Sequence, residues 1–317
     1  MSLISASFLA TLSALAKIAL IIGFSAWLVR KKIFDESHTR AITAVVVNLA
    51  LPCLIFSNVV KYFQVSAFPH WWKFPLIGAA MVLCVLALAW LVFSRTGPAR
   101  NTLIALATLQ NAGYLVLPMG EVLFPHEFER FSIYVFLMLL AYMPLLWSLG
   151  VFLISHRQGM KLKPSYVFNA PFCAMALALG LVFTGLAPVV PELILEPVEL
   201  VGASCVPLAT VVLGLTMGML HVNRLPSFFN VARVVGIKLV AVPLIMFCLL
   251  KYTSFSSGNL ENAFWILEAS SPPATALALQ AIHFGGDEKL VCGILVICYL
   301  VALFTIPLFF SLVQVFL

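Results

Sequence analysis

Apolar residues form long runs along this chain, and short clusters of charged residues separate one run from the next. The runs reach about 20 residues, the length that an α-helix needs to cross a bilayer. This alternation predicts an all-α integral membrane protein with ten transmembrane helices. The predicted spans are residues 7–29, 41–60, 72–94, 102–123, 130–155, 167–187, 197–220, 228–250, 261–284 and 290–314.

Composition narrows the class of protein further. Hydrophobic residues make up 63% of the 317 residues and charged residues only 9%, whereas about a quarter of a typical soluble domain is charged. A water-soluble globular enzyme is therefore excluded. The lipid bilayer is the expected surrounding of nearly the whole chain.

The formal net charge of +6 does not indicate a nucleic-acid partner, because the basic residues stand beside the spans, where they orient helices. Most loop Lys and Arg follow the odd-numbered spans, as Arg30, Arg95 and Arg157 do. Positive charge marks the cytoplasmic side, so both termini are expected on the non-cytoplasmic side. The seven cysteines lie in apolar runs without metal-binding spacing, so neither a metal nor a cofactor is expected.

The loop at residues 157–166 divides the chain into two halves, residues 1–156 and residues 167–317. Each half holds five predicted spans, and an odd number of spans inserts the second half upside down relative to the first. The sequence therefore predicts two inverted five-helix repeats joined by a short cytoplasmic linker.

Two pairs of residues support an inverted repeat. Pro52 and Pro207 lie at similar depths in the second and seventh spans, and Asn111 of the fourth span aligns with Ser271 of the ninth. We expect Pro52 and Pro207 to let their helices bend around a central site rather than to touch a substrate.

The fourth and ninth predicted spans contain residues that end helices. In the ninth, Ser271 precedes Pro272 and Pro273, and proline removes a backbone donor and clashes with the preceding turn. Ser271 is expected to cap a second half-helix that has Pro272 as its first residue. In the fourth, Asn111 is expected to cap a second half-helix in the same way, with Pro118 beyond it.

Both interruptions are expected near the bilayer midplane, because Asn111 and Ser271 lie about 15 Å into their spans and the hydrocarbon layer is about 30 Å thick. Unsatisfied backbone groups at this depth are tolerated where they line an enclosed or water-filled cavity. Broken helices in two matching repeats mark the substrate site of transporters, and the positive starts of half-helices favour an anion. The alternative is that both are ordinary kinks packed against neighbouring helices.

Candidate substrate-binding residues surround the two interruptions. Asn111 either contacts the substrate or forms an interhelical hydrogen bond. Lys17, within the first span, either balances an anion or extends its long side chain to the interface. The candidates are Gln110, Asn111, Gly113, Tyr114, Ser270, Ser271, Thr275, Asn48 and Lys17.

Other ionisable residues fall within apolar runs. Glu268 stands one helical turn before the interruption of the ninth span, where it either carries a coupling proton or is a capped or interface-facing carboxylate. Arg233 and Lys238 lie toward the cytoplasmic part of the eighth span, and Arg233 is expected to extend to the interface.

Three motifs resemble those of the auxin efflux carrier family. They are residues 47–52 (VNLALP), 110–118 (QNAGYLVLP) and 302–307 (ALFTIP). The resemblance covers essentially the whole chain, and an asparagine followed seven residues later by proline, Asn111 and Pro118, is its most specific part.

The resemblance implies that the fourth and ninth spans cross at their breaks, that a moving crossover group lies beside a scaffold group, and that the protein is a homodimer. It also implies transport of organic carboxylates, from auxins to dicarboxylates such as malate or malonate, with Asn111 contacting the substrate. The loop at residues 157–166 is much shorter than the middle loop of plant members. A compact permease of a bacterial inner membrane is therefore expected.

The expected function is secondary transport of organic anions by alternating access around a midplane site. A membrane sensor with the same fold would bind its ligand without transporting it, and a channel would be separated from a carrier by electrical recording of its turnover. Motifs of an intramembrane enzyme are absent from the sequence, so no enzymatic activity is expected. The coupling ion and the identity of the substrate stay open.

Overall fold

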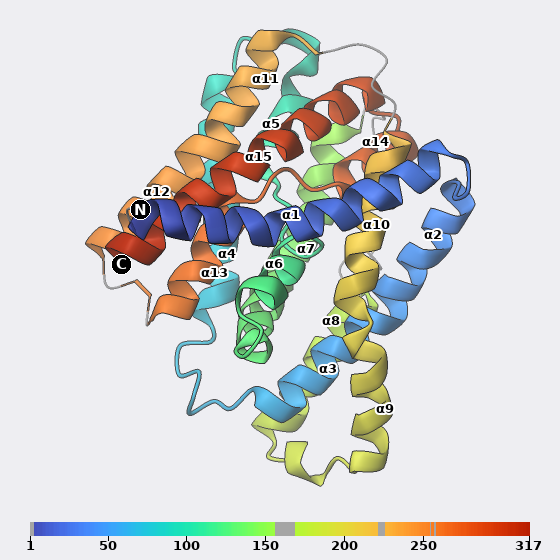
Figure 1. Cartoon of the computed structure of the whole chain (residues 1–317), viewed down its shortest axis with the longest axis vertical. Coiled ribbons are helices and arrows are strands. Elements are labelled where there is room, and N and C mark those ends of the chain that lie inside the picture. The colour runs from blue at the N-terminus through green and yellow to red at the C-terminus, as the bar shows by residue number, and fades with distance from the viewer. Residues whose placement is uncertain (1–2, 156–168, 221–225, 254, 257) are drawn as a thin grey trace.

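The computed structural model describes residues 3–155, 169–220, 226–253, 255–256 and 258–317, and the predicted linker at residues 157–166 lies outside these residues. Within the described residues every regular element is a helix (Figure 1). The elements are α1 (Leu3–Arg30), α2 (Glu36–Val45), η1 (Val46–Ala50), α3 (Leu51–Tyr62), α4 (Lys73–Val92), η2 (Gly97–Ala99), α5 (Arg100–Thr108), α6 (Val116–Leu123), α7 (Phe128–Ile154), α8 (Ala170–Phe183), η4 (Ala187–Val189), α9 (Glu192–Ala203), α10 (Cys205–Met219), α11 (Phe228–Val235), η5 (Gly236–Ala241), α12 (Val242–Tyr252), α13 (Asn259–Ser270), α14 (Ala276–Phe284) and α15 (Glu288–Phe316).

The expectation of an all-α membrane protein is confirmed. Seven helical stretches of the described chain are long and apolar enough to cross a bilayer, and α8 is a shorter apolar helix. Two further apolar stretches are each divided into two short helices, α5 with α6 and α13 with α14. Their arrangement as ten spans in two inverted repeats stays a prediction. The long stretches are Ile4–Arg30, Glu36–Tyr62, Lys73–Val92, Phe128–Ile154, Glu192–Met219, Phe228–Tyr252 and Glu288–Phe316.

Prolines explain the irregular turns inside the long stretches. Pro52 follows the π-helix η1, and Pro243 follows the π-helix η5. A proline ring clashes with the carbonyl group four residues earlier, and a wider π turn before it relieves that clash. Pro207 stands in the first turn of α10, directly after the short break at Ser204 that separates α10 from α9. The helices are therefore irregular at both predicted prolines, Pro52 and Pro207, and bending around a central site stays a prediction.

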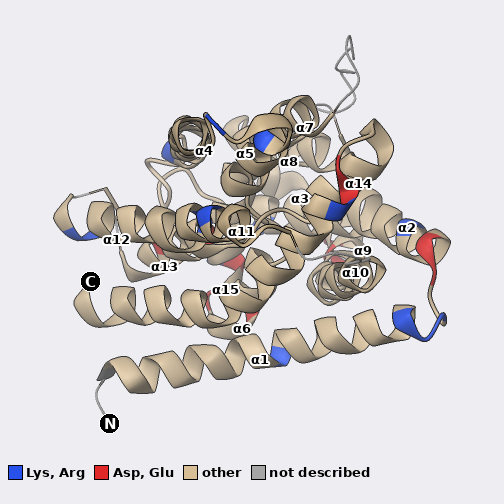
Figure 2. Cartoon of the chain, turned by 90° about the horizontal axis from the view of Figure 1, so that it is seen from above, with Lys and Arg blue, Asp and Glu red and all other residues tan. Residues whose placement is uncertain are grey.

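The helices pack into two groups. In the first, which we call the scaffold group, α1 lies along α10, and α3 lies against α8 and α9. In the second, the crossover group, α4, α5 and α14 pack on α7, and α13 packs on α12 and α15. Both views show α1 at the outside of the molecule, where it also contacts α15 of the crossover group (Figures 1 and 2).

Small residues let α10 approach α1 closely. A Cβ atom at Gly214 would lie 2.5 Å from the carbonyl oxygen of Ile22, and one at Gly218 would lie 2.7 Å from that of Ala26. Glycines four residues apart are a common contact between membrane helices, because they allow the two backbones to touch. The α1–α10 contact therefore depends on both glycines.

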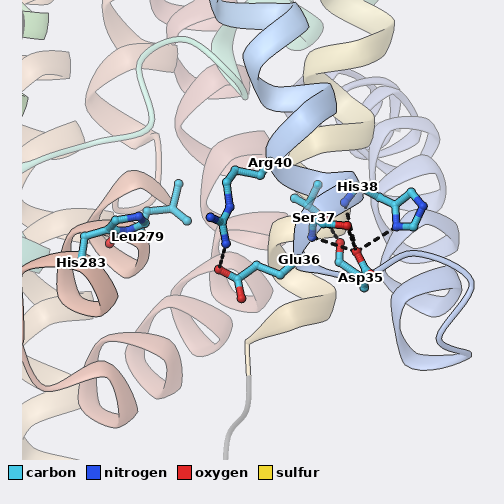
Figure 3. A network of polar contacts seen from close by, with 8 residues as sticks. Asp35, Glu36, Ser37, His38, Arg40, Leu279 and His283 are labelled. Carbon is cyan, nitrogen blue, oxygen red and sulfur yellow. Dashed lines mark hydrogen bonds and ion pairs between the residues drawn. The ribbon is translucent and has the colours of Figure 1, made fainter.

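Charged residues are scarce along the helices, as the mostly tan ribbon of Figure 2 shows. The start of α2 carries one charged network, in which Asp35 caps the helix (Figure 3). Its carboxylate accepts hydrogen bonds from the backbone amides of Ser37 and His38, from the Ser37 hydroxyl and from the His38 ring. These contacts hold the pKa of Asp35 well below its usual range, and the hydroxyl of Ser37 contributes most.

Candidate functional site

The break between α5 and α6 lies against the break between α13 and α14. The chain leaves helical geometry between Thr108 and Val116, and again between Ser270 and Ala276. The amide of Asn111 donates a 2.8 Å hydrogen bond to the carbonyl oxygen of Pro272, and the amide of Ala274 donates a 2.9 Å bond to that of Leu109.

A side chain adds a third bond to this short antiparallel pairing. The hydroxyl of Ser271 donates to the carbonyl oxygen of Asn111 over 3.0 Å, and Gln110 stands opposite Pro273. Backbone groups freed by the two breaks thus satisfy one another, as a nonpolar surrounding requires.

The expected capping roles of Ser271 and Asn111 are wrong. Ser271 is the residue that ends α13, with φ −65° and ψ 135°, and α14 begins only at Ala276. α6 begins at Val116, with Leu115 before it and no side chain capping its start. Pairing between the two extended segments occupies the residues that would otherwise begin the half-helices.

A cavity of about 280 Å³ lies beside the crossing point. Residues of α7, α14 and the interrupted segments form one side of it, and residues of η1, α3, α8 and α10 form the other. The cavity therefore lies between the crossover group and the scaffold group. Its lining residues are Val46, Val47, Leu51, Gln110, Asn111, Ala112, Gly113, Tyr114, Leu117, Leu139, Tyr142, Met143, Leu146, Trp147, Asn169, Pro171, Cys205, Ala209, Ala274, Thr275 and Ala276.

Five of the predicted substrate-binding residues line this cavity. They are Gln110, Asn111, Gly113, Tyr114 and Thr275. None of the described residues that line it is charged, and most of them are apolar or aromatic. The wall can accordingly hold an apolar group along most of its surface and polar groups near the crossing point.

Hydrogen bonds from neighbouring helices fix the polar part of the wall. The side-chain nitrogen of Asn111 donates to the hydroxyl of Tyr299 on α15 over 2.5 Å. The hydroxyl of Tyr142 on α7 donates to the carbonyl oxygen of Gln110. Asn169 caps the start of α8, where its side-chain oxygen accepts a 3.0 Å bond from the amide of Phe172. These polar groups are therefore held in fixed orientations.

The structure does not bring Lys17 and Asn48 to the cavity. Lys17 is exposed on the outer helix α1, where its side chain can extend along the surface. Asn48 is also exposed, and its amide donates back to the carbonyl oxygen of Ala44 within the same helix over 3.0 Å. Neither residue lines the cavity. This corrects the expected position of Asn48 at the site and, for Lys17, agrees with the alternative of a side chain that extends outward.

The remaining predicted residues lie around the crossing rather than in the cavity wall. Ser270 and Ser271 are buried, and Pro272 and Pro273 belong to the extended segment after α13. Pro118 lies in the first turn of α6, a position that needs no intrahelical donor. Pro118, Pro272 and Pro273 therefore lie at the interruptions, where they disfavour a continuous helix.

The sequence did not single out Lys238 as part of the site. Lys238 lies on η5, is fully buried and donates to the side-chain oxygen of Gln110 over 3.4 Å. Glu268, on α13, is also fully buried and lies close enough to interact with Lys238. Its predicted role in carrying a proton stays a prediction.

Comparison with known families identifies the class of protein. The sequence profile of the family described as membrane transport protein matches residues 10–166 and 165–310. The chain belongs to this family. The resemblance to auxin efflux carriers is thereby confirmed, and the protein is a membrane transport protein.

Two related transporters come from archaea. An uncharacterized transporter of Methanothermobacter thermautotrophicus is 28% identical over 284 residues, which cover 87% of this chain and 89% of the relative. An uncharacterized transporter of Methanocaldococcus jannaschii is 24% identical over 282 residues, which cover 87% and 90%. The similarity extends over nearly the full length of both relatives.

Proposed function

We propose that this transporter carries organic anions, and that its preferred substrates are monocarboxylates with an apolar or aromatic body. The cavity beside the crossing of the two interrupted stretches carries this proposal, because it lies between both helix groups and combines a long apolar wall with a small polar end. Its volume of about 280 Å³ is near the lower end of the range for small-molecule sites.

Helix starts support the negative charge of the substrate. The wall includes Thr275 and Ala276 at the start of α14, Tyr114 just before α6, and Asn169 at the start of α8. The start of a helix carries partial positive charge and backbone N–H groups that suit a carboxylate. The side-chain amide of Asn111 adds a neutral donor at the same end.

The lining also supports a single negative charge. Tyr114, Tyr142 and Trp147 offer aromatic surface to the body of the substrate. No described residue of the wall is a lysine or an arginine, and a second carboxylate against this apolar surface would lose its hydration without a cation to balance it. Dicarboxylates such as malonate are therefore expected to bind more weakly than aromatic monocarboxylates.

Movement of the crossover group against the scaffold group would give access from alternate sides of the membrane. The position of the cavity between the two groups supports this mechanism. The direct bonds between the segments at Asn111 and Pro272 would let the two interrupted stretches move as one unit. The loop charges support an orientation with both termini outside the cytoplasm.

Flux into proteoliposomes tests the proposal. Labelled phenylpyruvate and indole-3-acetate are expected to enter vesicles that contain the protein faster than protein-free vesicles, with saturation, and labelled malonate is expected to enter more slowly. Asn111→Ala is expected to weaken uptake of the two aromatic acids. Saturable binding without flux would instead indicate a sensor, and ionic currents far above carrier turnover would indicate a channel. Either result would overturn the proposal.

A further inference from the structure

Two ionisable side chains are buried inside the crossover group, behind the wall of the cavity. Lys238 on η5 and Glu268 on α13 each have 0% of their surface exposed. Charge within a membrane protein is costly, and buried ionisable residues of membrane helices generally mark ion pathways or proton relays. A buried acid and a buried base near the same wall therefore point to a shared task.

Gln110 connects these two side chains with the cavity. Nζ of Lys238 lies 3.4 Å from Oε1 of Gln110. Glu268 lies near enough to Lys238 and to the Gln110 amide to interact with both electrostatically, without forming a direct ion pair with Lys238. Three buried polar atoms here have no hydrogen-bond partner of normal geometry among the described residues. They are the two carboxylate oxygens of Glu268 and the Nε2 atom of Gln110. Gln110 itself belongs to the cavity wall. A change in the charge of Glu268 or Lys238 therefore changes the electrostatic potential inside the cavity.

The surroundings of the pair contain groups that are ordinarily neutral. Tyr142 of α7 lies near Glu268, and Cys298 of α15 lies near Lys238. Tyrosine and cysteine carry a proton at neutral pH. The charge state of Glu268 is thus the main electrostatic influence on Lys238, and the reverse holds as well.

We propose, on the basis of the transport function above, that Glu268 and Lys238 form the site at which a proton is bound and carried together with the organic anion. With Glu268 ionised, its charge compensates the ammonium group of Lys238. When Glu268 takes up a proton, the ammonium group of Lys238 loses its compensating charge. The carboxylate of a substrate in the cavity, on the other side of Gln110, then compensates the Lys238 cation instead.

The charges balance at each step. Without substrate, the Lys238 cation and the Glu268 anion sum to zero. With both ligands bound, the Lys238 cation, the neutral Glu268 and the substrate anion again sum to zero. Each ligand therefore lowers the cost of binding the other, and this coupling is reciprocal. One proton and one monocarboxylate move together without net charge.

A proton suits this pair better than a sodium ion does. A sodium ion beside Glu268 would be repelled by the ammonium group of Lys238 and would require several oxygen ligands. A proton needs only the carboxylate.

Uptake of labelled phenylpyruvate into proteoliposomes, with the membrane potential clamped at zero, tests the coupling. An inward proton gradient is expected to accelerate uptake by the unmodified protein, and an inward sodium gradient is not. Glu268→Gln is expected to lose the acceleration, and its exchange of labelled for unlabelled phenylpyruvate is expected to become independent of pH. Lys238→Met is expected to lose uptake, because the anion no longer meets a cation.

Two residues of neighbouring helices provide matched controls. Glu121 on α6 is half-buried and lies near Cys205, and Lys251 on α12 is exposed and lies over the ring of Phe316. Glu121→Gln and Lys251→Met are expected to keep the response to the proton gradient. Thermal unfolding of all four variants verifies that each one folds.

Infrared difference spectra during a pH titration test proton binding without any substrate. The protonated-carboxyl band of the unmodified protein is expected to contain a component from Glu268, which remains in Glu121→Gln and is missing from Glu268→Gln. Uptake that ignores the proton gradient, follows a sodium gradient, or keeps its gradient response in Glu268→Gln would overturn the inference and leave the transport function standing. Absence of flux from the unmodified protein would overturn both, and the infrared band would then report proton binding without coupled transport.

Discussion

The side-chain nitrogen of Asn111 donates a 2.5 Å hydrogen bond to the hydroxyl oxygen of Tyr299. Asn111 lines the cavity, whereas Tyr299 lies outside it on α15, next to α1. Tyr299 therefore holds the amide of Asn111 from behind and fixes the direction in which that amide meets a substrate.

Tyr299→Phe removes this acceptor and lets the Asn111 amide rotate. A hydrogen bond of this kind contributes about 1 kcal/mol, so we expect the half-saturation concentration for phenylpyruvate flux to rise by about fivefold, less than with Asn111→Ala. Tyr62→Phe changes an exposed tyrosine and serves as the control. An unchanged half-saturation concentration in Tyr299→Phe would show that the bond does not position Asn111.

Gly218→Leu tests the close contact of α10 with α1. The new side chain would meet the backbone of Ala26, and such overpacking costs about 1–3 kcal/mol. The detergent-solubilised variant is expected to unfold at a lower temperature than the unmodified protein. Gly23→Leu adds the same side chain on α1 at a position with open space around it and is expected to have little effect. Equal midpoints for the two variants would argue against a tight α1–α10 contact.

Asp35 makes the stability of the α2 start dependent on pH. Hydrogen bonds from Ser37 and His38 lower the pKa of this carboxyl in the folded state, so its contribution is present above the unfolded pKa of about 4 and is lost as the pH falls toward the folded value. Asp35→Ala is therefore expected to unfold at a lower temperature than the unmodified protein at neutral pH. The difference should shrink below about pH 4; a difference that persists in acid would contradict the cap.

Glu261 tests a buried ion pair on the crossover group. Its carboxylate lies 2.6 Å from Nζ of Lys73 and accepts a 3.2 Å bond from the ring of Trp265. Replacing one partner of a buried pair typically costs about 3–5 kcal/mol, so Glu261→Gln is expected to lower the unfolding temperature clearly. Glu199 pairs with Lys61 near the surface, and Glu199→Gln is expected to cost less than about 1 kcal/mol. The reverse order of the two variants would contradict this ranking.

The helical stretches could be predicted from the sequence because hydropathy and span length are local properties. The long described helices overlap the ten predicted runs and extend a few residues past several of their ends, and both interruptions lie where Asn111 and the Ser271–Pro273 segment predict them. The capping roles of Asn111 and Ser271 could not be predicted correctly, since they depend on a backbone pairing between segments that lie far apart along the chain.

Lys238 and Tyr299 were missed for a related reason. Both lie on helices that are apolar on all sides, so the hydrophobic pattern does not reveal which side faces the site. For Lys238 the π-helix η5 adds a further change, because a wider turn alters the direction of the residues within it. The helical hydrophobic pattern assumes a regular pitch, so it does not give the direction of a residue within a π-helix.

The bonds between Leu109, Asn111, Pro272 and Ala274 also constrain how the protein is made. The hydroxyl of Ser271 and the carbonyl of Asn111 are separated by 160 residues, so the first interrupted stretch enters the bilayer long before its partner is synthesised. Until then its freed peptide groups need water or another temporary partner, because lipid offers none. The first half of the chain can thus reach its final form only after the second half has been inserted.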